Sequence, residues 1–420
     1  MELYRYARAG NWPVLLGYLL FTGMMAVGYL YNVTFVQLGL VDLGMRYVGL
    51  SRAGVAVYMA GLALLTCVIA LGTGSRNGRR PLRQRLQIAW GVVATQTVLT
   101  ALATAVHNPL QFALWIAGCA VTLGIGVPVT FSLMLDLIAV RDRGYVAAVI
   151  TALAYFAAAT ITTTWEIEAL RTVMLLVMVP GVVAFGVIAW VPLSFIDELA
   201  GNRFHPRFAI GRFSQGGRRL PLFLGFMFGV FFIDSLGFLR IIETPSFMEG
   251  AWQAAEAAPR LTIGITHIVT ALIGGVFYSA LGERSLFYWI FGLFAMAHLM
   301  YSMELMLGSE GNASLAMPLL YATAVSLYTV VNFAVWADLS TPETIGRNAA
   351  LGVALSGWTA TFISTALAMW WQEAGLSLLM HLRIVNAFAL LFFAGMLLAL
   401  VAPRRDQGRA SAEQHRNSKQ

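Results

Sequence analysis

The chain has 420 residues, of which 59% are hydrophobic and 11% are charged, whereas soluble proteins usually carry about 25% charged residues. This composition excludes an ordinary soluble protein and places most of the chain in lipid. The net charge of +7 does not indicate nucleic-acid binding. The basic residues, all but one of them arginine, stand mostly in short gaps between apolar runs.

Apolar runs of about 20 residues, the length that crosses a bilayer, recur along the whole chain. We therefore expect an all-α integral membrane protein with twelve transmembrane helices. The first six are predicted over residues 13–36, 53–73, 86–106, 110–135, 145–165 and 172–195. The second six are predicted over residues 220–242, 261–281, 286–307, 316–337, 349–371 and 384–401.

The basic residues lie unevenly in the gaps between these runs. Counted over alternate gaps, 21 of the 27 lie on one side and six on the other. Since Lys and Arg near helix ends are held in the cytoplasm, both termini and the middle loop are predicted to be cytoplasmic. We expect a multi-pass protein of the inner membrane that contacts lipids, binds no nucleic acid and is monomeric.

The longest polar stretch between spans, residues 196–219, divides the chain into two sets of six helices. We expect an N-terminal bundle over residues 1–195 and a C-terminal bundle over residues 220–402. The stretch between them is predicted to be a cytoplasmic basic linker, and residues 403–420 a flexible cytoplasmic tail.

The two halves are weakly alike in sequence. VGYLYNVTF from Val27 in the first helix corresponds to LGFLRIIET from Leu236 in the seventh. DLIAVRDRGYVAA from Asp136 corresponds to DLSTPETIGRNAA from Asp338. Such a parallel repeat predicts a binding site between the halves, near the middle of the membrane.

The loop after the second helix reads GTGSRNGRR from Gly72 to Arg80. Together with the twelve spans, their six-plus-six division and the basic middle loop, it resembles the major facilitator superfamily. Gly78, Arg79 and Arg80 match that family's signature, whereas Ser75 stands where the family usually has an acidic residue. The resemblance implies two pseudo-symmetric six-helix bundles and secondary transport by alternating access, with helices 1, 4, 7 and 10 lining the central cavity. It identifies no subfamily.

Asp234 lies inside the seventh predicted helix, where a charged side chain costs at least about 2.5 kcal/mol to insert. Such a residue is a candidate for function, and we expect Asp234 to bind a proton or a cationic substrate. The alternative is a structural hydrogen bond or ion pair with another helix.

Polar and aromatic side chains recur at helical spacing on several spans, as a solute path lined by hydrogen-bonding groups requires. Interhelical packing and anchoring at the membrane interface are the alternative interpretation of such side chains. The residues that we expect to line a substrate cavity are Tyr29, Asn32, Tyr155, Asp234, Tyr328, Asn332 and Trp358.

Charged residues at helix ends are candidates for contacts that brace or gate the moving bundles. We expect Asp136 to pair with Arg79 or Arg80, and Asp338 to pair with Arg347. Arg240 and Glu243, three residues apart, are expected to pair at the outer mouth. The complete set of gating and bracing candidates is Arg79, Arg80, Asp136, Arg143, Arg240, Glu243, Asp338 and Arg347.

Other function classes have weaker support. The ninth helix carries Met296, His298, Met300 and Met303, soft ligands that could hold copper(I), although Met is also a common lipid-facing residue. No nucleotide-binding loop, zinc-protease motif or serine-hydrolase motif occurs, so we expect neither an enzyme nor a cofactor. Two hypotheses remain beside metal transport. One is a secondary transporter of a small solute, with proton coupling through Asp234, and the other is a transporter-like assembly factor or pigment- and lipid-handling factor.

Overall fold

The structure is a computed structural model that describes the whole chain except residues 162–164, 215–218, 243, 281–282, 308–313 and 402–420. Its described part contains twelve helices that are long and apolar enough to cross a membrane. The chain is therefore a multi-pass membrane protein, and the predicted all-α fold class is confirmed.

The first half begins with one long helical span, Trp12–Tyr47, built from α2 (Trp12–Leu30), η1 (Tyr31–Gly39), α3 (Leu40–Asp42) and η2 (Leu43–Tyr47). Its other spans are α4 (Arg52–Asn77), α5 (Leu82–Leu102), α6 (Pro109–Leu137), α7 (Arg143–Thr160) and α8 (Ile167–Trp190).

The second half has the spans α11 (Arg219–Ile242), α13 (Ala257–Ala280), α14 (Glu283–Leu307), α15 (Ala316–Asp338) and α18 (Leu378–Val401). Between α15 and α18 lies one further span, composed of α16 (Ile345–Ala349), η6 (Ala350–Thr359) and α17 (Ala360–Glu373).

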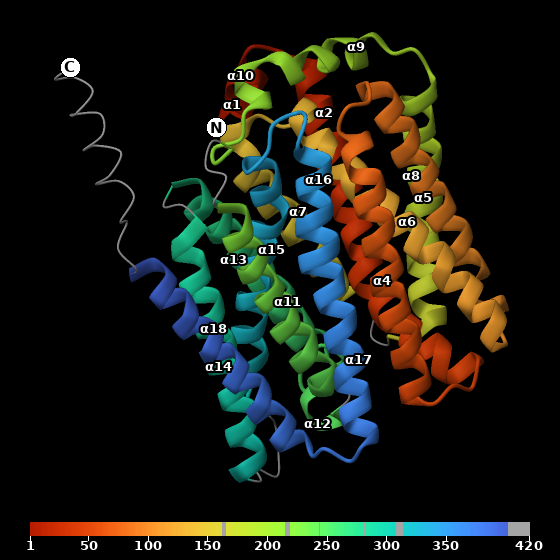
Figure 1. The fold of residues 1–420 in the computed structure, drawn as a ribbon, viewed down its shortest axis with the longest axis vertical. Coiled ribbons are helices and arrows are strands. Elements are labelled where there is room, and N and C mark those ends of the chain that lie inside the picture. Colours follow the sequence, from red (N-terminus) through yellow and green to blue (C-terminus); the bar gives the residue numbers. More distant parts are fainter. Residues whose placement is uncertain (162–164, 215–218, 243, 281–282, 308–313, 402–420) are drawn as a thin grey trace, which may run out of the picture.

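Short helices mark the two ends of the bundle. We call one end the linker side, because it carries the connecting helices α9 (Ser194–Ala200) and α10 (Pro206–Ala209) together with α1 (Glu2–Arg8). The opposite end, which carries α12 (Pro245–Met248), is the far side. Figure 1 shows the first half in red to yellow-green beside the second half in green to blue.

Several predicted boundaries differ from the structure by five residues or more, among them the start of the twelfth span, which lies at Leu378 instead of residue 384. The first span continues to Tyr47 instead of ending near residue 36. Gly39 makes the extension possible, because a Cβ there would lie 2.9 Å from the Cδ1 atom of Ile167. The sixth span begins at Ile167, five residues earlier than predicted, where the Asp42 carboxylate accepts a hydrogen bond from the Ile167 backbone N–H at 2.8 Å. This contact satisfies one of the free donors at the start of α8.

Proline is accommodated inside α6 through a neighbouring helix. Pro128 has no N–H, so the Gly124 carbonyl four residues earlier lacks its usual helical donor. The Thr73 hydroxyl on α4 lies 3.3 Å from this carbonyl oxygen and 2.9 Å from the Ile69 carbonyl oxygen of its own helix. Since an unsatisfied carbonyl is costly in lipid, sharing of the Thr73 proton between the two carbonyls helps to accommodate the proline.

The two halves meet along two seams of small residues. In the α4/α16 seam, a Cβ on Gly74 would lie 2.7 Å from the Gly346 carbonyl oxygen. In the α7/α13 seam, a Cβ on Gly275 would lie 2.8 Å from the Gly144 carbonyl oxygen. Small residues let membrane helices approach closely, so these glycines set the distance between the halves on the linker side.

Candidate functional site

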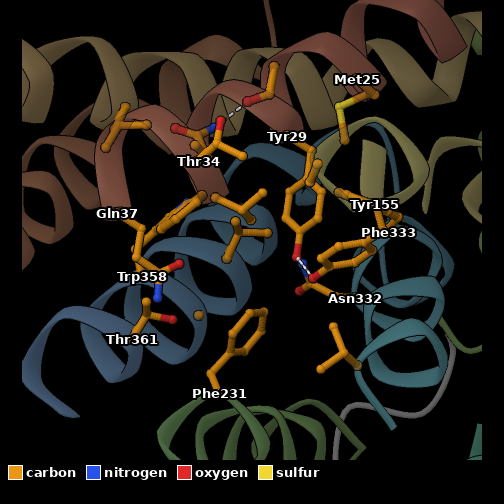
Figure 2. Close-up of a pocket in the computed structure, with 18 of the residues that line it drawn as sticks. Met25, Tyr29, Thr34, Gln37, Tyr155, Phe231, Asn332, Phe333, Trp358 and Thr361 are labelled. Atoms are coloured by element: carbon orange, nitrogen blue, oxygen red, sulfur yellow. Dashed lines mark hydrogen bonds between the residues drawn. The ribbon is translucent and has the colours of Figure 1, made fainter. Parts of the chain in front are cut away.

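A cavity of about 180 Å³ lies between the two halves. Its walls come from the first span, α5, α6 and α7 of the first half, and from α11, α13, α15 and the η6–α17 span of the second. The structure brings together all seven predicted cavity residues, because Tyr29, Asn32, Tyr155, Asp234, Tyr328, Asn332 and Trp358 line it. Figure 2 shows the side chains of Tyr29, Tyr155, Asn332 and Trp358 at the cavity.

Asp234 is held by two tyrosines of α15. The Tyr321 hydroxyl donates to Asp234 Oδ1 at 2.6 Å, and the Tyr328 hydroxyl donates to Oδ2. The two tyrosines are seven residues apart, which places them on one face of the helix. Asp234 as a whole residue is half-buried, and it lines the cavity.

The charge of Asp234 has no basic counterpart in the site. Among the described residues, none of the Lys or Arg side chains lines the cavity, and none forms an ion pair with Asp234. Its hydrogen bonds come from neutral hydroxyl groups, which stabilise a carboxylate without cancelling its charge. A structural ion pair, one alternative considered for Asp234, is therefore excluded within the described residues, whereas the structural hydrogen bonds are present.

A second polar group joins the halves across the cavity. The Tyr29 and Tyr155 hydroxyls lie 2.8 Å apart, and both lie within hydrogen-bonding distance of Thr329 on α15, at 3.4 and 3.3 Å. Figure 2 shows the two tyrosines pointing toward one another. The Tyr155 ring also stacks on His267, whose Nδ1 lies 2.8 Å from the Ser326 hydroxyl.

Three residues that line the cavity each have a buried polar atom without a hydrogen-bond partner. They are Asn32, through Oδ1, and Trp165 and Trp358, through their indole N–H groups. Most buried polar groups in proteins are hydrogen-bonded, but these three atoms are enclosed, so a ligand reaches them only after the surrounding side chains move. Asn332 differs, because its Oδ1 accepts a hydrogen bond from the Trp336 indole at 2.9 Å.

The two longest stretches of π-helix occur in spans that line the cavity. Asn32 and Gln37 project from η1, and Trp358 projects from η6. A π-helix carries an extra residue per turn and is frequent at functional sites. These segments could not be predicted from the sequence, because the apolar pattern of η1 and η6 is compatible with an ordinary α-helix.

The cavity is closed on the linker side by charged groups from both halves. Arg143 at the start of α7 pairs with Asp338 at the end of α15, with 2.9 Å between Nη1 and Oδ1. The Tyr278 hydroxyl donates to the other Asp338 oxygen at 2.9 Å, and Arg212 of the linker lies 3.7 Å from it. Arg203 of the linker donates to the Pro342 carbonyl at 2.6 Å and to the Gly78 carbonyl in the other half.

The far side of the cavity is narrowed by aromatic contact between the halves. The rings of Trp165 and Phe238 lie 6.1 Å apart, and both residues border the cavity. Phe238 also stacks on Tyr321, one of the two tyrosines that hold Asp234.

The expected bracing pairs, which we predict to form in one state only, are not the ion pairs of this conformation. Asp136 pairs with Arg85, at 2.7 Å and within the first half, in place of Arg79 or Arg80. Asp338 pairs with Arg143 in place of Arg347. Arg79, Arg80 and Arg347 are exposed on the linker side. The exposed arginines are hydrated, whereas the buried carboxylates need a buried cation, which only the three-dimensional packing identifies.

Two further expectations concern α11 and α14. Arg240 is buried, while its expected partner Glu243 lies outside the described residues. On α14, Met296 and Met303 are each 50% exposed, whereas His298 is fully buried on the opposite face. The thioether and imidazole groups therefore do not converge on one copper site.

Several cavity residues were not singled out from the sequence as site candidates. They include Tyr321, Phe231 and Phe238 around Asp234, and Trp165 and Trp252 on the far side. Helical spacing places Tyr321 on the same face of α15 as Tyr328 and Asn332, although we did not include it among the site candidates. It could not have found the two tryptophans, because both stand outside the helical spans.

Several solved structures share this arrangement of helices. The xylose transporter XylE from E. coli, in a partially occluded inward-open conformation, matches with a TM-score of 0.64 and 14% identity over 93% of this chain and 100% of that chain. The human organic anion transporter MFSD10 matches with a TM-score of 0.61 and 15% identity over 91% and 99% of the two chains.

A bacterial homologue of the iron transporter ferroportin, in an outward-facing state, matches with a TM-score of 0.55 and 14% identity over 92% and 98% of the two chains. No family model matches the sequence, and no curated protein matches it either. Structural similarity at such low sequence identity establishes the fold, but it does not identify the transported solute. The chain is a multi-pass membrane protein with the fold of the major facilitator superfamily, as the resemblance of its sequence implied.

Proposed function

We propose that this protein is a secondary transporter, which carries a small solute across the membrane by exposing the central cavity to its two sides in turn. The observation that carries the proposal is a cavity that is lined by both halves, contains the carboxylate of Asp234, and is closed on the linker side by contacts between the halves. A site between two repeats of six helices is the arrangement in which rocking of one half against the other changes access.

The linker-side contacts are of a kind that can break reversibly. Arg143 and Asp338 are fully buried, so their attraction is offset by the loss of hydration. If the halves separate on this side, water reaches both groups and replaces much of the lost interaction. The closed and open states can therefore differ by only a few kcal/mol, as a two-state transporter requires.

Proton coupling through Asp234 is part of this proposal. A carboxyl group without a basic partner can change its charge when the cavity opens to solutions of different pH, and α11 would then respond to the gain or loss of a proton. The proposed location is the inner membrane with both termini in the cytoplasm, which makes the linker side the cytoplasmic side.

The test is a distance measurement that needs no known solute. Spin labels at Arg76 and Glu343 report the linker side, and labels at His107 and Glu249 report the far side; all four residues are exposed and each pair joins the two halves. The native cysteines Cys67 and Cys119 are buried and should remain unlabelled. We expect two distance populations in each pair, and conditions that lengthen one distance should shorten the other.

A single fixed distance in both pairs, across pH and in the presence of solute mixtures, would contradict alternating access. That outcome would favour the alternative of a static membrane partner, such as an assembly factor or a pigment- or lipid-handling factor.

A further inference from the structure

We propose that the cavity binds an organic cation, an ammonium compound with an apolar body, whose charge is balanced by Asp234. This inference rests on the proposed function and adds a substrate class to it. It follows from the charge of the cavity, from the aromatic groups around the carboxylate and from the access that the carboxylate has to the cavity.

The charge of the cavity is the first observation. Asp234 is the only acidic side chain among the described lining residues, and no Lys or Arg among them balances it. An isolated charge away from water is strongly unfavourable, and proteins normally pair it. The one basic residue among the described lining residues is His267, whose Nδ1 lies 2.8 Å from the Ser326 hydroxyl and for which no ion pair with Asp234 is found. The counter-ion of an ionised Asp234 is then a mobile one, either a proton or a cationic ligand.

The surroundings of Asp234 favour an organic cation over a small metal ion. Phe231 and Phe238 lie three residues before and four residues after it on α11, so all three share one helical face. The Phe231 ring lies 5.0 Å from that of Tyr328, and the Phe238 ring lies 5.5 Å from that of Tyr321. Aromatic faces attract ammonium groups, whereas a metal ion requires several oxygen ligands.

The opposite wall of the cavity is also aromatic and mostly uncharged. Tyr29 and Phe333 are in edge-to-face contact at 4.8 Å, and Trp358 projects from η6 (Figure 2). Apolar ring surface of this kind accommodates the hydrocarbon body of a ligand. An anionic solute would face the negative charge of Asp234 with no described basic side chain to bind it.

The carboxylate remains able to accept a ligand. Each oxygen accepts one tyrosine hydroxyl, and a carboxylate oxygen has a further lone pair. Asp234 is half-buried instead of enclosed, and the residue borders the cavity. One carboxylate cannot hold a proton and balance a second cation at the same time, so proton and substrate should compete for it.

The experiment measures binding to the purified full-length protein by calorimetry, with empty micelles subtracted. The probe is benzyltrimethylammonium, whose charge does not change with pH, and its matched partner is neopentylbenzene, in which carbon replaces the nitrogen. We expect saturable binding of the cation that is at least about tenfold tighter than that of the neutral probe, and that weakens as the pH falls.

Three variants identify the groups responsible. Asp234→Asn should weaken cation binding by about tenfold or more and abolish its pH dependence, with little effect on the neutral probe. Phe231→Leu keeps an apolar side chain but removes the ring, and it should weaken cation binding by about threefold. Asp197→Asn makes the same charge change on an exposed residue of the linker helix α9, and should bind like the unmodified protein.

Failure of this inference can be told apart from failure of the proposed function. Equal binding of the two probes, absence of saturable cation binding at millimolar concentration, or unchanged pH-dependent binding by Asp234→Asn would overturn the organic-cation site. The distance measurements could still show alternating access, and the protein would then transport another class of solute. Cation binding without any change of access would support the site and contradict transport.

Discussion

Arg143 and Asp338 form a fully buried ion pair, although they belong to different halves of the chain and are 195 residues apart in sequence. Their contact joins the start of α7 to the end of α15 on the linker side of the cavity. Any movement that opens the cavity toward this side has to separate them, so the pair is a direct probe of the closed state.

Replacing Asp338 with Asn should favour opening on the linker side. The substitution leaves the buried Arg143 without its counter-charge, which destabilises a closed structure by about 3–5 kcal/mol. Opening brings water to Arg143 and relieves part of this loss. We expect the Arg76–Glu343 distance to shift toward longer values in spin-label measurements.

The matched control for this variant is Asp136→Asn. Asp136 and Arg85 form a second buried pair, but both residues belong to the first half. Breaking it should lower the thermal stability without lengthening the Arg76–Glu343 distance. Equal distance changes in the two variants would show that general destabilisation, and not loss of the bridge between the halves, opens the structure.

Adding a single methyl group at Gly74 should favour opening on the linker side, as Asp338→Asn should. A Cβ there would lie 2.7 Å from the Gly346 carbonyl oxygen, which is too close for the present seam. We expect Gly74→Ala to increase the linker-side-open population. Gly72→Ala is the control, because a Cβ at Gly72 would meet nothing within 4 Å, and the change should raise helix stability by up to about 1 kcal/mol. If the two variants had the same linker-side-open population, close packing in the α4/α16 seam would not control access on this side.

Asp234→Asn should separate proton coupling from substrate exchange. Asn keeps the shape and can still accept a hydrogen bond, but it cannot take up a proton at the oxygen that Asp ionises. In proteoliposomes with an imposed pH gradient, we expect the variant to lose concentrative uptake and to retain exchange of a transported solute only at a solute concentration that is higher by about tenfold or more, because the site has lost its charge. Full accumulation by the variant would assign Asp234 a packing or substrate-orienting role alone.

The orientation in the membrane can be tested with reporter fusions. A fusion at Gly201, in the linker, and one at the C-terminal tail should both report the cytoplasm, because 21 of the 27 basic residues fall on that side. A periplasmic signal at either position would contradict the proposed topology.

The sequence was sufficient for the number of spans and for the surface that faces the cavity. Twelve apolar runs correspond to twelve helices, and a period of about 3.6 residues places Tyr328 and Asn332 on the same face as Tyr321. Both signals are local, since they depend only on hydrophobicity and on the geometry of one helix.

The partners of charged residues could not be predicted in this way. Asp136 has several arginines nearby in sequence, and the one that it binds, Arg85, is selected by the packing of α5 against α6. The Arg143–Asp338 pair depends on how the two halves dock. The continuation of the first span to Tyr47 likewise depends on contacts with α8. A hydropathy profile contains no information about such contacts between helices that are distant in sequence.

The α7/α13 seam has a consequence for the speed of movement. Gly144, Ala148 and Gly275 present backbone and methyl surface at this crossing. Side chains of this size have few or no rotamers to lose, and they do not interlock like the knobs and holes of larger residues. The side chains of Tyr278 and Ser279 also lie against Gly144, so movement at this crossing has to displace these two side chains, whereas the small residues themselves present no interlocking barrier.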